Sequence, residues 1–343
     1  MASATSLLSL SSSSIRLAAA IPIPRSTFAH GVICGDSVNF SVEPMSSTEM
    51  SVPVTQTDGE TYIRFIFTAK QKTLFREQVY EVCFDQIRLC EGAAEVRKPV
   101  PGKVDITDEP LSVTVFAGAV IYRFNKWISA FESIAVNGKE LLDRPLSFNF
   151  FRAPVDNDVM RGDWYWAYLN DYTAKNHGVT VTKTECGAEI SLWQSCGCSI
   201  HQPFAYMDVV CSISADGALD IKCSAETSNK VTFLPRFGIR MFLPERFRRV
   251  EYFGYGPYES YIDKHQVSYI GKFSADISEM HEDYICPQEN LSHFGCRYMT
   301  VSDGETAENS PRRRGFSSAL LSTRRRSLRQ SGTTLSLKSA AVA

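Results

Sequence analysis

The sequence predicts an all-β protein with antiparallel sheets, because strand-like alternation and hairpin dipeptides are frequent while helical periodicity is rare. Apolar and polar residues alternate with a period of two in several segments, which is the pattern of strands with one buried face. The clearest examples are residues 63–67, 219–223 and 237–241. Two dipeptides, Asn137-Gly138 and Asp216-Gly217, tolerate the positive φ that type I′ hairpin turns require. The strands that flank them are therefore expected to pair antiparallel.

One short helix is expected between residues 163 and 175. Large apolar side chains recur there at helical spacing, and Asp163 precedes them as the candidate N-cap. These side chains are Trp164, Ala167, Tyr168 and Tyr172. Two interpretations of Trp164 and Trp166 stay open, because large aromatic rings either stack against a sugar or pack in the core.

Length and composition are those of a soluble globular protein of about two domains. The chain has 343 residues, of which 44% are hydrophobic. Its net charge of −2, with 22% charged residues, gives no electrostatic reason to expect nucleic acid or an anionic membrane as a partner. The apolar run at residues 17–23 is too short to span a bilayer, so no membrane segment is expected.

The two ends of the chain differ in composition from its middle. No acidic residue precedes Asp36 or follows Glu308, and two arginine triplets lie between residues 312 and 326. Residues 1–45 are expected to be disordered or a transit peptide. The cytoplasm is the expected location, with a plastid as the alternative. Residues 306–343 are expected to form a disordered basic tail, with a nucleic-acid-binding arm as the alternative.

Three segments are expected between these ends. Residues 93–110 are interpreted as a linker, because prolines and a glycine interrupt a charged, weakly periodic stretch. Residues 46–92 contain about three or four expected strands, too few to close a sandwich of roughly 100 residues. Residues 111–305 contain most of the strand pattern and are expected to form the main body of the protein.

The ten cysteines are scattered through the chain, unlike the dense pattern of a secreted disulfide scaffold. We expect most of them to be reduced and buried. Cys196, Cys198 and His201, and separately His293 with Cys296, superficially resemble zinc ligands. Neither group has the paired spacing of a tetrahedral zinc site, so no metal site is predicted.

The run at residues 151–158, FRAPVDND, predicts a rigid arm that presents a polar tip. Its proline fixes φ and holds the preceding residue extended, and short polar side chains suited to turns follow. Arg152 is expected to pair with Asp156 or Asp158 and so to fix the loop. The Asp156-Asn157-Asp158 tip either satisfies local backbone N–H groups or contacts a sugar or an active site.

The run at residues 252–264, YFGYGPYESYIDK, predicts a packed corner rather than a solvent-exposed loop. Its glycines and proline allow a tight backbone path, and the surrounding aromatic rings must be buried against something. Glu259 is interpreted as a structural acceptor of hydrogen bonds from backbone groups or tyrosine hydroxyls. The residues expected to build the corner are Gly254, Gly256, Pro257, Glu259 and Tyr261.

These two runs, in this order and at this spacing, resemble the small-chain (C-terminal) domain of the glycoside hydrolase family 2 β-galactosidases. The resemblance extends through residues 134–142, 287–290 and 295–297 and covers approximately residues 110–303. It implies a large antiparallel sandwich of the galactose-mutarotase-like supersandwich type, truncated at its C-terminal end. Residues 62–65 and 79–91 resemble the last strands of the preceding immunoglobulin-like domain, which implies a partial sandwich at residues 46–92.

The resemblance also implies a function. The chain looks like a component or fragment of a β-galactosidase that hydrolyses terminal β-galactosides such as lactose. The family's catalytic (β/α)₈ barrel, with its acid and nucleophile glutamates, is expected to be absent and to lie on a large chain or homologous subunit. Arg152, Asp156, Asn157 and Asp158 would line the mouth of that barrel, and this chain would contribute no catalytic residue. The magnesium and sodium ions of the family would bind mainly elsewhere, and the chain alone is expected to be inactive.

Three alternatives remain at this point. The first is a galactoside-binding module without a catalytic partner. The second is an aldose-epimerase-like enzyme of related architecture, and the third is a broken gene product without a stable fold. The second alternative requires a positioned histidine and glutamate, and none of the six histidines lies in a convincing site motif.

Overall fold

The structure is a computed structural model of the 343-residue chain. It describes residues 47, 49, 59–69, 71–75, 77–91, 100–228, 231 and 233–303, and the backbone of four further strands, β1, β2, β19 and β20. The chain divides into two compact units. The N-terminal unit comprises Met1–Arg97 with Tyr269–Gly271, and the main unit comprises Lys98–Ser268 with Lys272–Ala343.

The N-terminal unit contains a four-stranded antiparallel sheet in the order β2-β1-β3-β4. Its small core is centred on Ile63 and Phe67, both on β3, where the sequence predicts a half-buried strand. Two of its strands, β3 and β4, lie within residues 46–92, where three or four strands were expected, and β1 and β2 lie within residues 1–45. Its assignment to an immunoglobulin-like domain stays a prediction. The strands are β1 (Ser13–Ala20), β2 (Val32–Phe40), β3 (Thr61–Ala69) and β4 (Glu81–Cys90).

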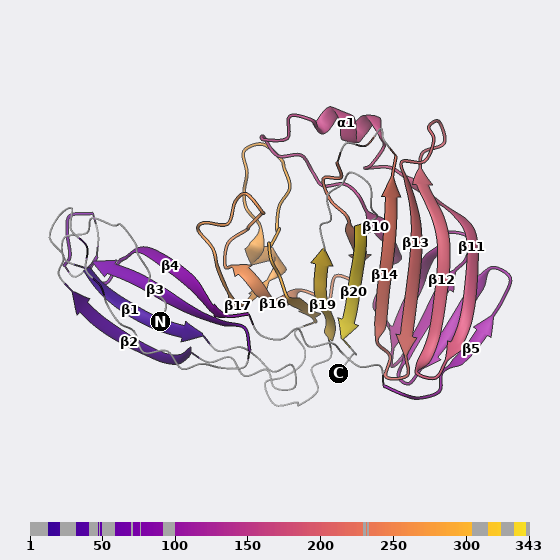
Figure 1. The fold of residues 1–343 in the computed structure, drawn as a ribbon, viewed down its shortest axis with the longest axis horizontal. Helices are drawn as coiled ribbons and strands as arrows, with labels where there is room; N and C mark the ends of the chain where they lie inside the picture. The colour runs from indigo at the N-terminus through magenta and orange to yellow at the C-terminus, as the bar shows by residue number, and fades with distance from the viewer. Residues whose placement is uncertain are drawn as a thin grey trace. The chain divides into compact units, whose positions relative to one another are not determined.

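The main unit contains sheets of nine, five and two strands (Figure 1). The nine-stranded sheet has the order β11-β12-β13-β14-β20-β19-β18-β16-β17. In that order its strands are Thr173–Thr184, Gly187–Gly197, Ala205–Ser214, Leu219–Thr227, Thr333–Ala340, Gly315–Thr323, Tyr298–Ser302, Arg249–Gly256 and Tyr269–Asp276. The five-stranded sheet runs β5 (Asp105–Asp108), β6 (Ser112–Ala117), β7 (Val120–Asn125), β8 (Ala130–Val136) and β9 (Lys139–Glu140). The two-stranded sheet pairs β10 (Arg144–Asn149) with β15 (Gly238–Phe242).

One contiguous apolar core joins the five-stranded and nine-stranded sheets. Alternate residues of β6 and β7 pack with alternate residues of β12, β13 and β14, as in a sandwich of two sheets. The Tyr122 hydroxyl donates a 2.7 Å hydrogen bond to the carbonyl of Gly217, which ties β7 to the β13–β14 turn. The removal of these apolar surfaces from water is the main stabilising contribution. The predicted all-β sandwich is confirmed.

Both predicted hairpin dipeptides lie in turns. Asn137 and Gly138 have φ of 50° and 76°, and Val136 pairs with Lys139 across them, as in a two-residue type I′ hairpin. Between β13 and β14 only Gly217 has positive φ, at 79°, because the connection is longer there. That second hairpin is therefore present but is not a two-residue type I′ turn.

The predicted helix exists but is shorter and begins earlier. Helix α1 spans Arg161–Trp166, so Asp163 lies in its first turn, and its N-cap is Met160, which makes no side-chain cap hydrogen bond. The chain then turns through Tyr168, with φ of 57°, and enters β11 at Thr173. Pairing of β11 with β12 thus overrides the helical spacing of the later aromatic residues. A short 3₁₀ helix, Ile277–Met280, was not expected from the sequence.

Several expectations concern residues near the ends and the linker. Strands β1 and β2 lie in the segment predicted to be disordered or a transit peptide, and β19 and β20 lie in the predicted basic tail. Strand β5 lies within the predicted linker. All other residues in the ranges 1–45 and 306–343 lie outside the described part of the chain. The domain boundaries stay predictions. Within the described part, none of the helices has the length and apolar character needed to cross a bilayer.

Because thiols are buried in the main core, the free energy of unfolding is expected to fall at alkaline pH. Burial raises the pKa of Cys196 and of Cys211 to about 12, from the usual thiol value of 9.0. Above pH 9 the unfolded chain loses these protons while the folded chain keeps them, so stability is full below pH 9 and falls toward pH 12. We expect a loss of about 1 kcal/mol per thiol at pH 10, measured by urea unfolding at pH 8 and pH 10. Cys211→Ala should reduce this dependence, whereas Cys286→Ala, at an exposed thiol, should not.

Candidate functional site

The loop after β10 is fixed by an internal ion pair. The Arg152 guanidinium donates two hydrogen bonds of 2.7 Å, one to each carboxylate oxygen of Asp158. The Arg152 and Asp158 side chains are only 19% and 12% exposed, so water screens this pair weakly. Asp158 also accepts a 2.7 Å hydrogen bond from the backbone N–H of Val155. The pairing expected for Arg152 is therefore present, and Asp158 rather than Asp156 is its partner.

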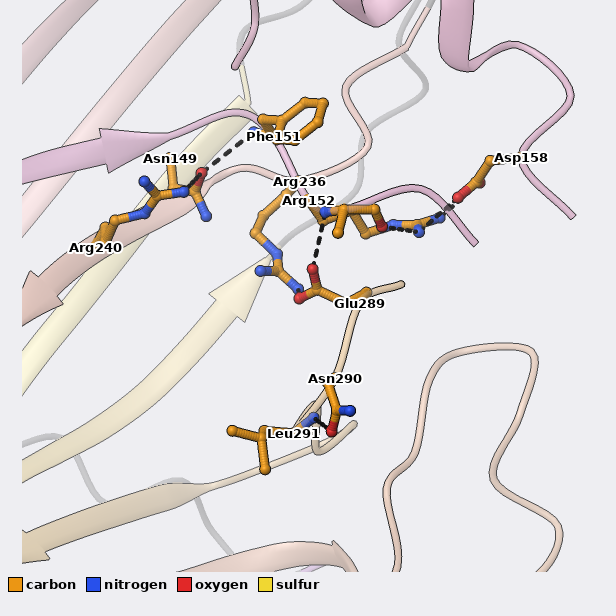
Figure 2. Close-up of polar contacts among 10 residues, drawn as sticks. Asn149, Phe151, Arg152, Asp158, Arg236, Arg240, Glu289, Asn290 and Leu291 are labelled. Atoms are coloured by element: carbon orange, nitrogen blue, oxygen red, sulfur yellow. Dashed lines mark hydrogen bonds and ion pairs between the residues drawn. The ribbon is translucent and has the colours of Figure 1, made fainter. Parts of the chain in front are cut away.

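A second ion pair holds the same loop from a distant part of the chain (Figure 2). Glu289 accepts a 3.0 Å hydrogen bond from the backbone N–H of Ala153 through one oxygen. Its other oxygen accepts a short hydrogen bond from Arg236, and the Glu289 side chain is 13% exposed. Sequence reasoning assigned no role to Arg236 or Glu289. The two contacts leave the loop little freedom on its inner side.

The tip of the loop is exposed. Asp156 and Asn157 both face solvent, and their side chains form no hydrogen bond or ion pair within the described part of the chain. The backbone N–H of Asp158 donates a 3.0 Å hydrogen bond to the carbonyl of Val155, which closes the turn below them. Of the four residues expected at the mouth of an active site, two therefore brace the loop and two remain available for contact.

The two tryptophans of α1 differ in environment. Trp164 is only 2% exposed and packs edge-on against Phe151 and Phe233, with the Arg152 guanidinium 5.3 Å from its ring. A ring enclosed in this way belongs to the core, which was one of its two interpretations. Trp166 is 55% exposed and lies 5.1 Å from the His201 ring. Sugar stacking by Trp166 stays a prediction.

The corner at the end of β16 is packed as tightly as the sequence indicates. A Cβ atom at Gly254 would lie 2.8 Å from the Cα of Cys296, and one at Gly256 would lie 2.5 Å from the Tyr252 hydroxyl. The backbone N–H of Tyr255 donates to the carbonyl of Phe294 at 3.1 Å. The glycines of the corner, which Pro257 follows directly, are therefore required by close approach of neighbouring groups.

Glu259 is the polar centre of the corner. It is 5% exposed, and one carboxylate oxygen accepts hydrogen bonds from Lys264, at 3.0 Å, and from the Tyr284 hydroxyl. Its other oxygen and the Tyr261 hydroxyl have no hydrogen-bond partner within the described part of the chain. Burial is the largest cause of the raised pKa of Tyr261, and the negative charge of Glu259 is the next. A hydrogen bond with Tyr284 raises the pKa of Lys264. Glu259 accepts from a tyrosine hydroxyl, as its structural interpretation expected.

The carboxylates of these elements are engaged in structural contacts. Asp158, Glu259 and Glu289 each have a cationic partner and at least one further hydrogen bond. Throughout the described part of the chain, no three His, Cys, Asp or Glu side chains gather in a group able to hold a metal ion. The arrangement is suited to hold a loop in place and to present its polar tip.

Comparison with known proteins agrees with this architecture. A family model described as β-galactosidase small chain matches residues 117–341. The chain is 28% identical over 273 residues to a β-galactosidase from Actinobacillus pleuropneumoniae, covering 78% of this chain and 27% of that protein. It is 27% identical over 243 residues to one from Staphylococcus xylosus, covering 69% and 24%. It is 29% identical over 229 residues to one from Kluyveromyces lactis, covering 61% and 22%.

These comparisons show which family the chain belongs to and how much of its relatives it covers. The chain spans about a quarter of the length of the curated relatives that it matches. The family model covers well over half of the chain and includes both the braced loop and the glycine corner. The chain therefore belongs to the β-galactosidase small-chain family.

Proposed function

We propose that this chain is a component of a β-galactosidase, acting with a catalytic chain or a homologous subunit on terminal β-galactosides such as lactose. The observation that carries the proposal is the family match over residues 117–341. The curated relatives that share this region are named β-galactosidases. Within the pair, the role that we assign to this chain is to support the mouth of the active site.

The geometry of the loop supports this role. Two ion pairs hold the loop from its inner side, while Asp156 and Asn157 point their polar groups to solvent. A loop that is fixed before its partner binds loses little conformational entropy on association. It can therefore present hydrogen-bonding groups to a sugar or to a neighbouring barrel at low cost.

The acid and the nucleophile are proposed to come from the partner. Retaining glycosidases need two carboxyl groups about 5–5.5 Å apart across a sugar-binding cleft. The carboxylates of Asp158, Glu259 and Glu289 are each paired with an arginine or lysine side chain. The resemblance implies magnesium and sodium ions, and no three His, Cys, Asp or Glu side chains gather to hold a metal ion in the described part of the chain. We propose that these ions bind mainly to the catalytic chain.

The test is complementation. The full chain should not hydrolyse o-nitrophenyl β-galactoside by itself. A chimaera should do so when this chain replaces the matching region of the Actinobacillus pleuropneumoniae enzyme, while that enzyme without the region should be inactive. Saturable turnover by the purified chain alone would contradict the proposal. A folded chimaera that binds substrate at its catalytic glutamates but never gains activity would contradict the supporting role.

A further inference from the structure

A cavity of about 440 Å³ lies in the main unit, beside the beginning of β11. Its walls come from residues 127–130 before and in β8, from β10, from residues 169–174, and from single residues of β12 and β15. This volume falls within the roughly 300–1,000 Å³ that is usual for small-molecule sites. None of its groups is used in the function proposed above.

A buried amide whose oxygen has no hydrogen-bond partner within the described part of the chain lines this cavity. Gln194 lies on the inward face of β12, in line with Ile190, Leu192 and Cys196, all of which are apolar and buried. Gln194 is only 1% exposed, and its Oε1 has no hydrogen-bond partner within the described part of the chain. Its Nε2 donates a 3.8 Å hydrogen bond to the sulfur of Met207, which is a weak acceptor. A core position that is polar and unsatisfied is unfavourable for folding alone and requires another explanation.

A second unsatisfied group lines the same cavity. The Ser129 hydroxyl belongs to a residue that is 8% exposed, and it also lacks a hydrogen-bond partner within the described residues. Ser129 lies in the turn before β8 and Gln194 lies on β12, far apart in the sequence, yet both line one cavity. A polar occupant would satisfy both.

The rim of the cavity adds groups of three further kinds. Trp127 is 78% exposed and offers an open aromatic face. Arg240 and Asp171 are exposed and of opposite charge, and neither forms an ion pair within the part of the chain that the structure describes. Asn149 accepts hydrogen bonds from Arg240, at 3.2 Å, and from the backbone N–H of Phe151, at 3.3 Å (Figure 2). Its amide NH₂ is therefore left as a donor.

We propose that this cavity binds a neutral mono- or disaccharide. An apolar ligand would leave Gln194 and Ser129 unsatisfied. An anionic ligand would meet the carboxylate of Asp171, and a cationic ligand would meet Arg240. A sugar has an apolar ring face for Trp127 and hydroxyls that both donate and accept hydrogen bonds. The proposal does not depend on the role in hydrolysis, because the groups that would bind the sugar all lie on this chain.

The experiment is calorimetric titration of the full chain with galactose, lactose, glucose and maltose. We expect saturable binding of at least one sugar. Trp127→Ala should weaken that binding about tenfold, because it removes the stacking face. The matched control is Trp193→Ala, since Trp193 is 47% exposed and follows Leu192 on β12 but lies outside the cavity lining. It should bind as the unchanged chain does.

Gln194→Met separates binding from folding. Methionine has a similar shape and no group that requires a hydrogen bond. We expect this variant to melt at the same temperature as the unchanged chain or higher, and to bind the sugar at least about tenfold more weakly. Absence of saturable binding of all four sugars by the folded chain would overturn the proposal and leave water as the occupant. Binding that neither Trp127→Ala nor Gln194→Met alters would overturn it as well, by placing the sugar elsewhere.

Discussion

Asp158→Ala is expected to lower the free energy of unfolding of the main unit by about 2–4 kcal/mol. The substitution removes the two 2.7 Å hydrogen bonds to Arg152 and leaves that largely buried guanidinium, 5.3 Å from the Trp164 ring, without its counter-charge. The backbone N–H of Val155 also loses its acceptor. Urea unfolding, followed by tryptophan fluorescence, measures the loss.

The matched control for this variant is two residues away. Asp156 is exposed and its side chain has no partner within the described part of the chain, so Asp156→Ala should change stability by less than about 0.5 kcal/mol. In the active chimaera both variants should lose activity, but for different reasons. Asp158→Ala should lose activity because the loop is released, whereas Asp156→Ala should lose activity with unchanged stability. Full activity in Asp156→Ala together with Asn157→Ala would contradict a contact between the loop tip and the active site.

Local patterns allowed much of the fold to be predicted. Alternation along β14 places Leu219, Ile221 and Cys223 on the buried face, as expected, because a strand has only two faces. The Asn137-Gly138 turn followed from backbone sterics alone, which act between neighbouring residues. The helix was predicted too long because its end depends on the pairing of β11 with β12. That pairing joins segments whose register no local signal gives.

The same distinction applies to the candidate site. The Arg152–Asp158 pair could be expected because both residues belong to one short loop. The contacts of Glu289 with Ala153 and Arg236 join residues 136 and 53 positions apart, and no spacing rule predicts such contacts. Gln194 did leave a signal, because it interrupts an apolar series at every second residue of β12. The cavity that gives this signal a meaning requires three sheets to be placed together.

Gly254→Ala is expected to destabilise the main unit by about 2–3 kcal/mol. The added methyl group would lie 2.7 Å from the Cys296 sulfur and 2.8 Å from its Cα. The sulfur can rotate away, but the Cα is backbone, and the hydrogen bond from the Arg297 N–H to the Phe253 carbonyl, at 2.7 Å, holds it near β16. Relief therefore requires the strand and the residue 295–297 segment to separate. Thermal and urea unfolding of the variant measure the effect.

Gly238→Ala is the comparison that separates the effect of a steric clash from the general effect of replacing a glycine. Gly238 is also a strand residue, in β15, but a Cβ atom there would meet nothing within 4 Å. Its substitution reduces the freedom of the unfolded chain without a clash, so stability should change by less than about 1 kcal/mol and in either direction. Equal losses in the two variants would mean that the corner accommodates a side chain. Gly254 would then be needed for its backbone conformation rather than for lack of space. The aromatic rings around it would not set the path of the chain.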